Sequence, residues 1–180
     1  MSANLIEGKY ASWRRLRREL GRRSLEPCGH VSFVFYFFVA VVTFGGAGIW
    51  TELRAYLNFV PTPNQPDPSL ASLRTAVITF FPALAGSSCM QLIWAEDHER
   101  SLRAFAVVIL TVLLLAIFFL TPEGVSNGLA ITGGLVASII ALWSWWIANA
   151  KQKDLLDLDA PTGGKAIGGE LAGNLDDFTV

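Results

Sequence analysis

Residues 104–120 read AFAVVILTVLLLAIFFL, a run of apolar side chains interrupted only by Thr111. A helix needs roughly 20 predominantly apolar residues to cross the ~30 Å of hydrocarbon in a bilayer. The run therefore predicts a transmembrane helix, whose backbone polar groups all bond within the helix. Three further apolar blocks lie at residues 31–50, 76–94 and 129–147, and none of the four blocks contains Asp, Glu, Lys, Arg or His.

The composition of the whole chain agrees with a membrane protein. Of the 180 residues, 52% are hydrophobic and 16% are charged, whereas soluble domains carry about 25% charged residues. The four blocks leave too little polar sequence for a separate soluble domain. We therefore predict an all-α fold in which four transmembrane helices form an antiparallel bundle, preceded by an N-terminal interfacial amphipathic helix.

The blocks divide the chain into three parts. A basic amphipathic tail, residues 1–30, precedes the transmembrane domain, residues 31–147, and an acidic tail expected to be flexible, residues 148–180, follows it. A proline-rich connection after the first block predicts an extended spacer. The other two connections are short, so we expect the second, third and fourth spans to be antiparallel neighbours.

The distribution of Lys and Arg predicts the orientation in the membrane. With both termini inside, the cytoplasmic segments hold twelve Lys and Arg residues, and the outer segments hold only Arg54 and Arg74. Because basic residues are enriched in cytoplasmic segments, both termini are predicted to be cytoplasmic. The bias fits the inner membrane of a bacterium. Cys28 and Cys89 then lie on the reducing side, and no structural disulfide is expected.

The N-terminal tail has the pattern of an amphipathic helix over residues 10–23. Apolar residues recur there at helical spacing, and six arginines fill much of the remainder. Such a helix binds an anionic membrane surface, although a solvated basic flank explains the pattern equally well. The residues predicted to contact lipid or a partner are Trp13, Arg14, Arg15, Arg17, Arg18, Leu155 and Leu156.

Small and polar residues inside the spans predict helix packing. Small residues let helix backbones approach closely, and the candidates are Gly45, Gly46, Ala130, Gly134 and Ser138. In the second span, Pro82 is expected to kink the helix. The polar residues Ser87, Ser88 and Gln91 follow it, and they predict either helix packing, which we favour, or the lining of a pore.

The candidates for chemistry are few. Cys28, His30, Glu96 and His98 all lie near the predicted cytoplasmic face, and these residue types bind transition metals. Their spacing matches no recognised metal site, so we expect neither a metal nor another cofactor. The spans also contain no carboxylate or His that an ion-coupled transporter uses, and no catalytic constellation indicates an enzyme.

These exclusions favour a non-enzymatic membrane protein. The leading hypothesis is an anchor or sensor subunit that binds membrane lipids, forms a homo-oligomer and recruits a soluble cytoplasmic protein, without binding nucleic acid directly. By analogy of layout alone, such a subunit fits a bacterial defence or signalling operon. The alternative is a small oligomeric channel or facilitator whose second span, residues 76–94, lines the pore.

Overall fold

The computed structural model describes residues 2–59, 69–94 and 100–157, with side chains from residue 11 onward. Within these ranges all regular secondary structure is helical, which confirms the predicted all-α fold. The long helices and short turns follow one another as α1 (Ser2–Leu25), η1 (Glu26–Gly29), α2 (Val31–Tyr36), η2 (Phe37–Phe44), α3 (Ala47–Leu57), α4 (Leu70–Trp94), α5 (Arg100–Leu120), α6 (Asn127–Asn149) and η3 (Lys153–Leu155).

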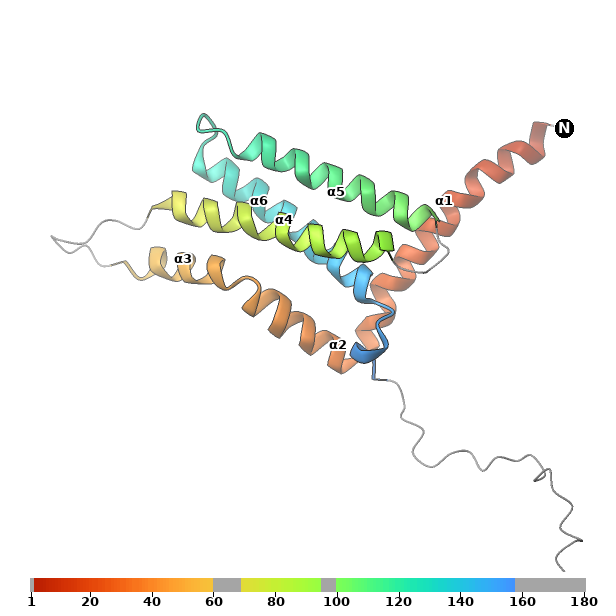
Figure 1. Cartoon of the computed structure of the whole chain (residues 1–180), viewed down its shortest axis with the longest axis horizontal. Helices are drawn as coiled ribbons and strands as arrows, with labels where there is room; N and C mark the ends of the chain where they lie inside the picture. Colours follow the sequence, from red (N-terminus) through yellow and green to blue (C-terminus); the bar gives the residue numbers. More distant parts are fainter. Residues whose placement is uncertain (1, 60–68, 95–99, 158–180) are drawn as a thin grey trace, which may run out of the picture.

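Helices α4, α5 and α6 lie side by side along most of their lengths (Figure 1). Each is long and apolar enough to cross a membrane. The described chain contains up to four such segments if the bent pair Ala11–Gly29 and Val31–Phe44 is counted as one span. Figure 1 also shows that α4 and α6 run in the same direction while α5 runs in the opposite one. The most extensive contact is between α4 and α6. The tightest pair is therefore parallel, and not one of the antiparallel pairs that follow each other in the sequence.

Small residues on α6 explain this close contact. Val77 of α4 is fully buried, and a Cβ added at Gly134 would lie 2.5 Å from its Cγ1. Only glycine fits at this position. Ala130 and Ser138 are buried on the same helix, so the small-residue face predicted from the sequence packs inside the chain.

The first apolar block forms a broken helix instead of the continuous one expected over residues 31–50. Helix α2 continues into the π-helical η2, which ends at Phe44, and Gly45 and Gly46 follow before α3 begins. A side chain at Gly45 would collide with the backbone carbonyl of Val41, and one at Gly46 would lie 2.5 Å from the carbonyl oxygen of Val42. These contacts assign both glycines to the break itself. The Trp50 indole helps to satisfy the backbone here by donating to Val42 O at 3.0 Å.

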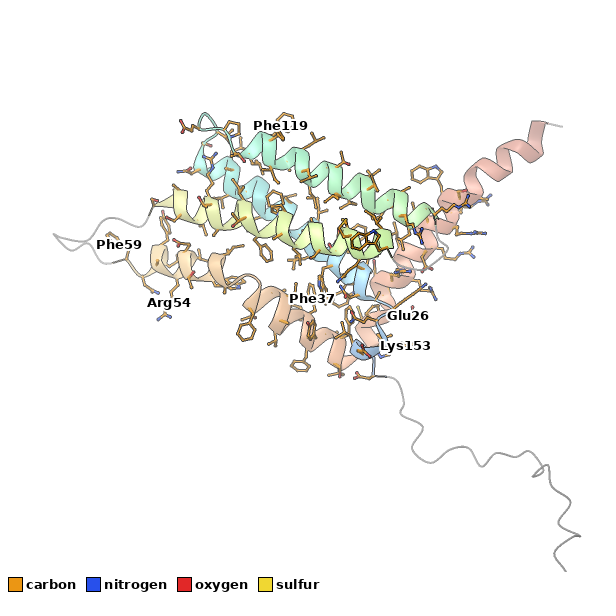
Figure 2. All side chains as sticks on the ribbon, viewed as in Figure 1. Glu26, Phe37, Arg54, Phe59, Phe119 and Lys153 are labelled. Atoms are coloured by element: carbon orange, nitrogen blue, oxygen red, sulfur yellow. The ribbon has the colours of Figure 1, made fainter. Side chains whose placement is uncertain are left out.

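Helix α1 lies across one end of the bundle (Figure 1). The axis of Ala11–Gly29 makes an angle of 96° with that of Val31–Phe44. We call the end covered by α1 the basal end, and the end formed by the start of α4 and the α5–α6 turn the distal end. Figure 2 shows Glu26 and Lys153 at the basal end and Arg54 near the distal end.

Candidate interaction surface

A partly buried ionic cluster holds α1 on the basal end. Glu19 Oε1 accepts hydrogen bonds from Arg22 Nη2 at 3.0 Å, Arg23 Nε at 2.9 Å and Lys151 Nζ at 3.1 Å. Burial of Glu19 raises the pKa of its carboxyl group, but the hydrogen bonds from the three cations outweigh burial and lower the pKa from 4.5 to about 2. Because Lys151 follows α6, the cluster joins the first long helix, α1, to the end of the last one, α6.

Arg23 and Ser24 extend this attachment to the end of α6. The Arg23 side chain is only 2% exposed, and its Nη1 donates to Ile147 O at 3.4 Å. The carbonyl groups in the last turn of a helix have no partner within the helix, so this contact satisfies one of them. The indoles of Trp143 and Trp146 donate to Ser24 Oγ and Ser24 O, both at 3.2 Å.

Apolar contacts complete the docking of α1. Leu16 is buried on the α1 face that meets the bundle, and Leu20 packs beside it. Their neighbours come from three helices, with Leu92 from α4, Leu102 from α5 and Ile147 from α6. Leu16 and Leu20, which dock α1, are two of the apolar residues whose helical spacing predicted the amphipathic helix.

The opposite side of α1 forms a basic face, which we define as Arg14, Arg15, Arg17 and Arg18. All four side chains are exposed, and the side chain of Trp13 beside them is 71% exposed. This face is centred opposite Leu16: at about 100° per residue, Arg14 and Arg18 lie opposite it, and Arg15 and Arg17 lie on the two flanks of the helix. The structure thus presents the predicted contact residues of α1 on a helix that is fixed to the bundle.

The beginning of the C-terminal tail is folded against the basal end. Leu155 and Leu156 pack on a cluster that contains Phe33 and Trp145. Asp157 Oδ2 accepts a hydrogen bond from Ser32 N at 3.1 Å, and the hydrogen bonds from Ser32 lower the pKa of Asp157. The two leucines predicted as partner or lipid contacts are therefore part of the packed structure.

The polar residues of the second predicted span do not form one row. Ser88 is fully buried, and its Oγ donates to Leu84 O at 2.8 Å. Ser87 is exposed on the adjacent face and donates to the same oxygen at 3.0 Å. Gln91 Oε1 accepts from Asn149 Nδ2 of α6 at 3.3 Å. Hydroxyls that bond to their own helix leave few groups to line a polar path.

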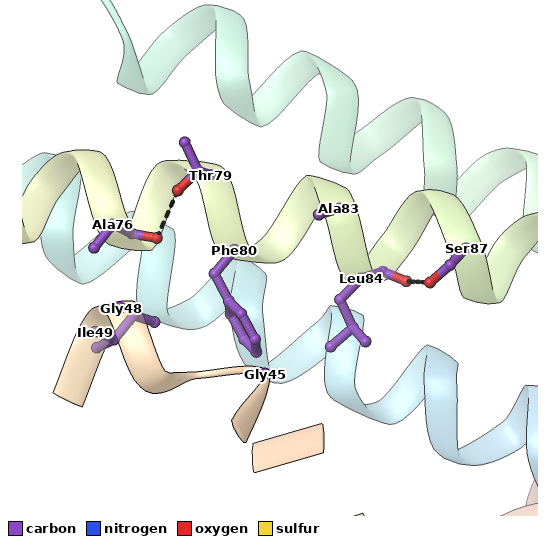
Figure 3. Close-up of a pocket in the computed structure, with 9 residues that line it drawn as sticks. All are labelled: Gly45, Gly48, Ile49, Ala76, Thr79, Phe80, Ala83, Leu84 and Ser87. Carbon is purple, nitrogen blue, oxygen red and sulfur yellow. Dashed lines mark hydrogen bonds between the residues drawn. The ribbon is translucent and has the colours of Figure 1, made fainter. Parts of the chain in front are cut away.

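A groove of about 440 Å³ lies between the break in the first block and α4 (Figure 3). Gly45 and Gly48 form one wall, and the Phe80 ring points toward Gly45 from the other. Two hydroxyls line the groove, and both donate to carbonyl groups of α4, from Thr79 to Ala76 at 3.0 Å and from Ser87 to Leu84 at 3.0 Å. The groove is therefore mainly apolar.

The candidate metal ligands are only partly described. Glu96 and His98 lie outside the described residues, while Cys28 is exposed and His30 is half-buried at the start of α2. In the described part of the chain, no group of three or more His, Cys, Asp or Glu side chains is placed to hold a metal ion. Cys28 Sγ instead contacts Ser24 O at 3.6 Å.

Arg74 forms a second attachment point, which the sequence pattern did not reveal. Its guanidinium donates to the distal turn between α5 and α6, and the acceptors are Leu120 O at 2.8 Å, Thr121 O at 2.9 Å, Pro122 O at 2.9 Å, Val125 O at 3.1 Å and Asn127 Oδ1 at 3.2 Å. In the sequence this arginine counted only as an outer charge. The one available signal is its position just before an apolar block, where α4 in fact begins at Leu70.

Comparison of the chain with protein-family models, with curated proteins and with solved structures finds no match.

Proposed function

We propose that this chain is a non-enzymatic, multi-pass protein of a bacterial inner membrane that holds a soluble protein at the cytoplasmic face. Its four spans are the broken segment from α2 to α3 and the helices α4, α5 and α6. The observation that carries the proposal is the basic face, which the Glu19 cluster holds in a fixed position on the basal end. The cytoplasmic partner binds this face.

Membrane insertion is supported by the exposed apolar side chains of α5. Val108, Leu115 and Phe119 are each more than half exposed, and Figure 2 shows Phe119 projecting from α5 near the distal end. A large contiguous apolar surface of this kind is rare on soluble monomers. Acyl chains cover it in the proposed arrangement.

The orientation rests on the two ends of the bundle. The basal end carries the basic face, and Arg54 and Arg74 belong to the distal segments. The positive-inside tendency then places the basal end in the cytoplasm. If α2 runs along the membrane normal, the 96° bend lays α1 in the plane of the inner interface.

Recruitment at this surface is favoured by its rigidity. A partner that binds a docked helix does not have to order it first, so less conformational entropy is lost on binding. The acidic tail offers a second contact of opposite charge. Self-association remains part of the proposal, although the small-residue face of α6 already packs against α4.

The test is affinity purification of the tagged full chain from its own cells in a mild detergent. A soluble protein should co-purify in a fixed ratio, and the combined substitution R14A/R15A/R17A/R18A should reduce its yield roughly tenfold or more. The control is Arg54→Ala, because Arg54 is an exposed arginine on α3 near the distal end. A homo-oligomer that carries no companion, or a companion retained by the fourfold variant, would sink the proposal.

A truncation separates the two tails. The truncation should remove residues 158–180 and keep residues 151–157, because residues 151–157 belong to the packed basal end. The truncated chain should insert normally. Any loss of the co-purifying protein then measures what the removed residues 158–180 contribute to its binding. Recruitment that survives this cut and fails in the arginine variant assigns binding to α1.

A further inference from the structure

A second cavity, of about 490 Å³, lies where α1 crosses the beginning of α5. Trp13 and Leu16 line it from α1, and Ala104, Phe105 and Val108 line it from α5. Ser12 and Ser101 also line it, but its exposed walls are almost entirely apolar. Its volume falls in the ~300–1,000 Å³ range typical of small-molecule sites. We call this cavity the α1–α5 crevice.

The walls of the crevice are held in place by packing on both helices. The Phe105 ring meets the Trp143 ring edge to face, with centroids 5.8 Å apart. Leu16 belongs to the buried cluster that docks α1. The crevice is therefore a feature of the docked arrangement of α1, and an occupant does not have to create it.

Positive charge flanks this apolar space on both helices. Arg17 lies four residues after Trp13 on α1, and Arg100 lies four residues before Ala104 on α5. Side chains four apart in a helix are neighbours on its surface, so each arginine stands beside a residue that lines the crevice. Both arginines are exposed, which leaves them able to reach an anionic group in front of it.

We infer that the α1–α5 crevice binds one anionic phospholipid of the inner leaflet. An acyl chain lies between Trp13 and Val108, and the headgroup phosphate meets Arg17 and Arg100. The inference deepens the proposed function and rests on its membrane insertion and orientation. It follows from charge complementarity, because an apolar slot bordered by basic side chains fits a ligand that has an apolar chain and an anionic head.

The orientation of the two helices fits this ligand better than a soluble one. In the proposed arrangement α1 lies in the interface, and α5 runs from it into the hydrocarbon. Val108 lies two turns into α5, on the membrane side of the crevice, while Arg17 and Arg100 remain at headgroup level. A lipid of the same leaflet enters such a slot from the side, without crossing water.

The test is native mass spectrometry of the purified full chain with dioleoyl phosphatidylglycerol and with dioleoyl phosphatidylcholine. These lipids share their acyl chains, and phosphatidylcholine has no net charge. The chain should bind phosphatidylglycerol roughly thirtyfold more tightly, because each of the two arginines near the headgroup contributes about 1 kcal/mol. The substitution V108W should fill the crevice and reduce binding of phosphatidylglycerol about tenfold. The substitution V112W, one turn further along α5 at a similarly exposed position, should leave binding unchanged.

A second variant, R17Q/R100Q, keeps the apolar walls and should abolish the preference between the two lipids. Equal binding of both lipids by the unmodified chain would overturn the inference, as would undiminished binding by V108W. A co-purified polypeptide that V108W removes and that phosphatidylglycerol does not displace would assign the crevice to a protein instead. No recruited partner is needed, so failure of recruitment and failure of lipid binding are distinguishable.

Discussion

Lys151 Nζ lies 3.1 Å from Glu19 Oε1, so an ion pair joins α1 to the residues that follow α6. Exposed ion pairs contribute only about 0–1 kcal/mol. Glu19 differs because its side chain is 13% exposed and two further cations, Arg22 and Arg23, share the carboxylate. This arrangement makes α1 part of the folded domain.

Replacing Glu19 with Gln should loosen the basal end. The substitution removes the Glu19 carboxylate that Arg23, which is 2% exposed, contacts at 2.9 Å, and breaking a largely buried ion pair costs roughly 3 kcal/mol or more. Thermal unfolding in detergent should show a clearly lower Tm at neutral pH. The matched control is Glu26→Gln, because Glu26 is half exposed and lies 4.0 Å from Arg22. The Tm of this variant should stay within about a degree or two of that of the unmodified chain.

The pH dependence of stability should also report on Glu19. Its pKa is lowered to about 2 in the folded chain from 4.5, so its stabilising contribution is complete above about pH 4.5 and is lost as the pH falls toward 2. Unfolding measured from pH 6 to pH 2 should steepen in that window. The slope should be smaller in E19Q, where Asp157 still contributes in the same direction. An identical slope in both proteins would refute the role given to Glu19.

Replacing Gly134 with Ala should weaken the contact between α4 and α6. The added Cβ would lie 2.5 Å from Val77 Cγ1, and overpacking of this kind costs about 1–3 kcal/mol. The control is Gly128→Ala on the same helix, where an added Cβ meets nothing within 4 Å. Combining G134A with V77A should recover part of the lost stability, and a stable G134A single variant would contradict the packing.

Replacing Arg74 with Leu should release the distal turn. The change removes hydrogen bonds to five acceptors, three of them in partly buried contacts and two in exposed ones, and each partly buried bond contributes about 0.5–1.5 kcal/mol. Lysine should rescue only part of this, because it lacks the planar fork of arginine. Hydrogen exchange should rise at residues 121–126 in R74L and stay unchanged in R54L.

The sequence predicted the helices better than their contacts. The apolar blocks at 104–120 and 129–147 coincide closely with α5 and α6, because a long apolar segment without charges has few alternatives to a helix. The break at Gly45 and Gly46 was not predicted, since paired glycines in an apolar block also suit close helix packing. The carbonyl contacts that distinguish the two roles appear only in three dimensions.

The long-range polar contacts were beyond the sequence pattern for a similar reason. Local spacing pairs Glu19 with Arg23 at i, i+4, but nothing local connects Glu19 with Lys151. The pore alternative needs Ser87 and Ser88 on one polar face, yet adjacent helical residues point about 100° apart. Ser87 therefore lines the groove, and Ser88 is buried.

The most direct test of the account is the accessibility of Cys28, a native exposed thiol at the basal end. In intact cells a membrane-impermeant maleimide should leave Cys28 unlabelled, and in inside-out vesicles it should label Cys28 fully. Thr51→Cys in a C28S background should show the reverse pattern, because Thr51 is exposed on α3 beyond the break in the first block. Labelling of Cys28 in intact cells would contradict the cytoplasmic basal end and the recruitment proposed there.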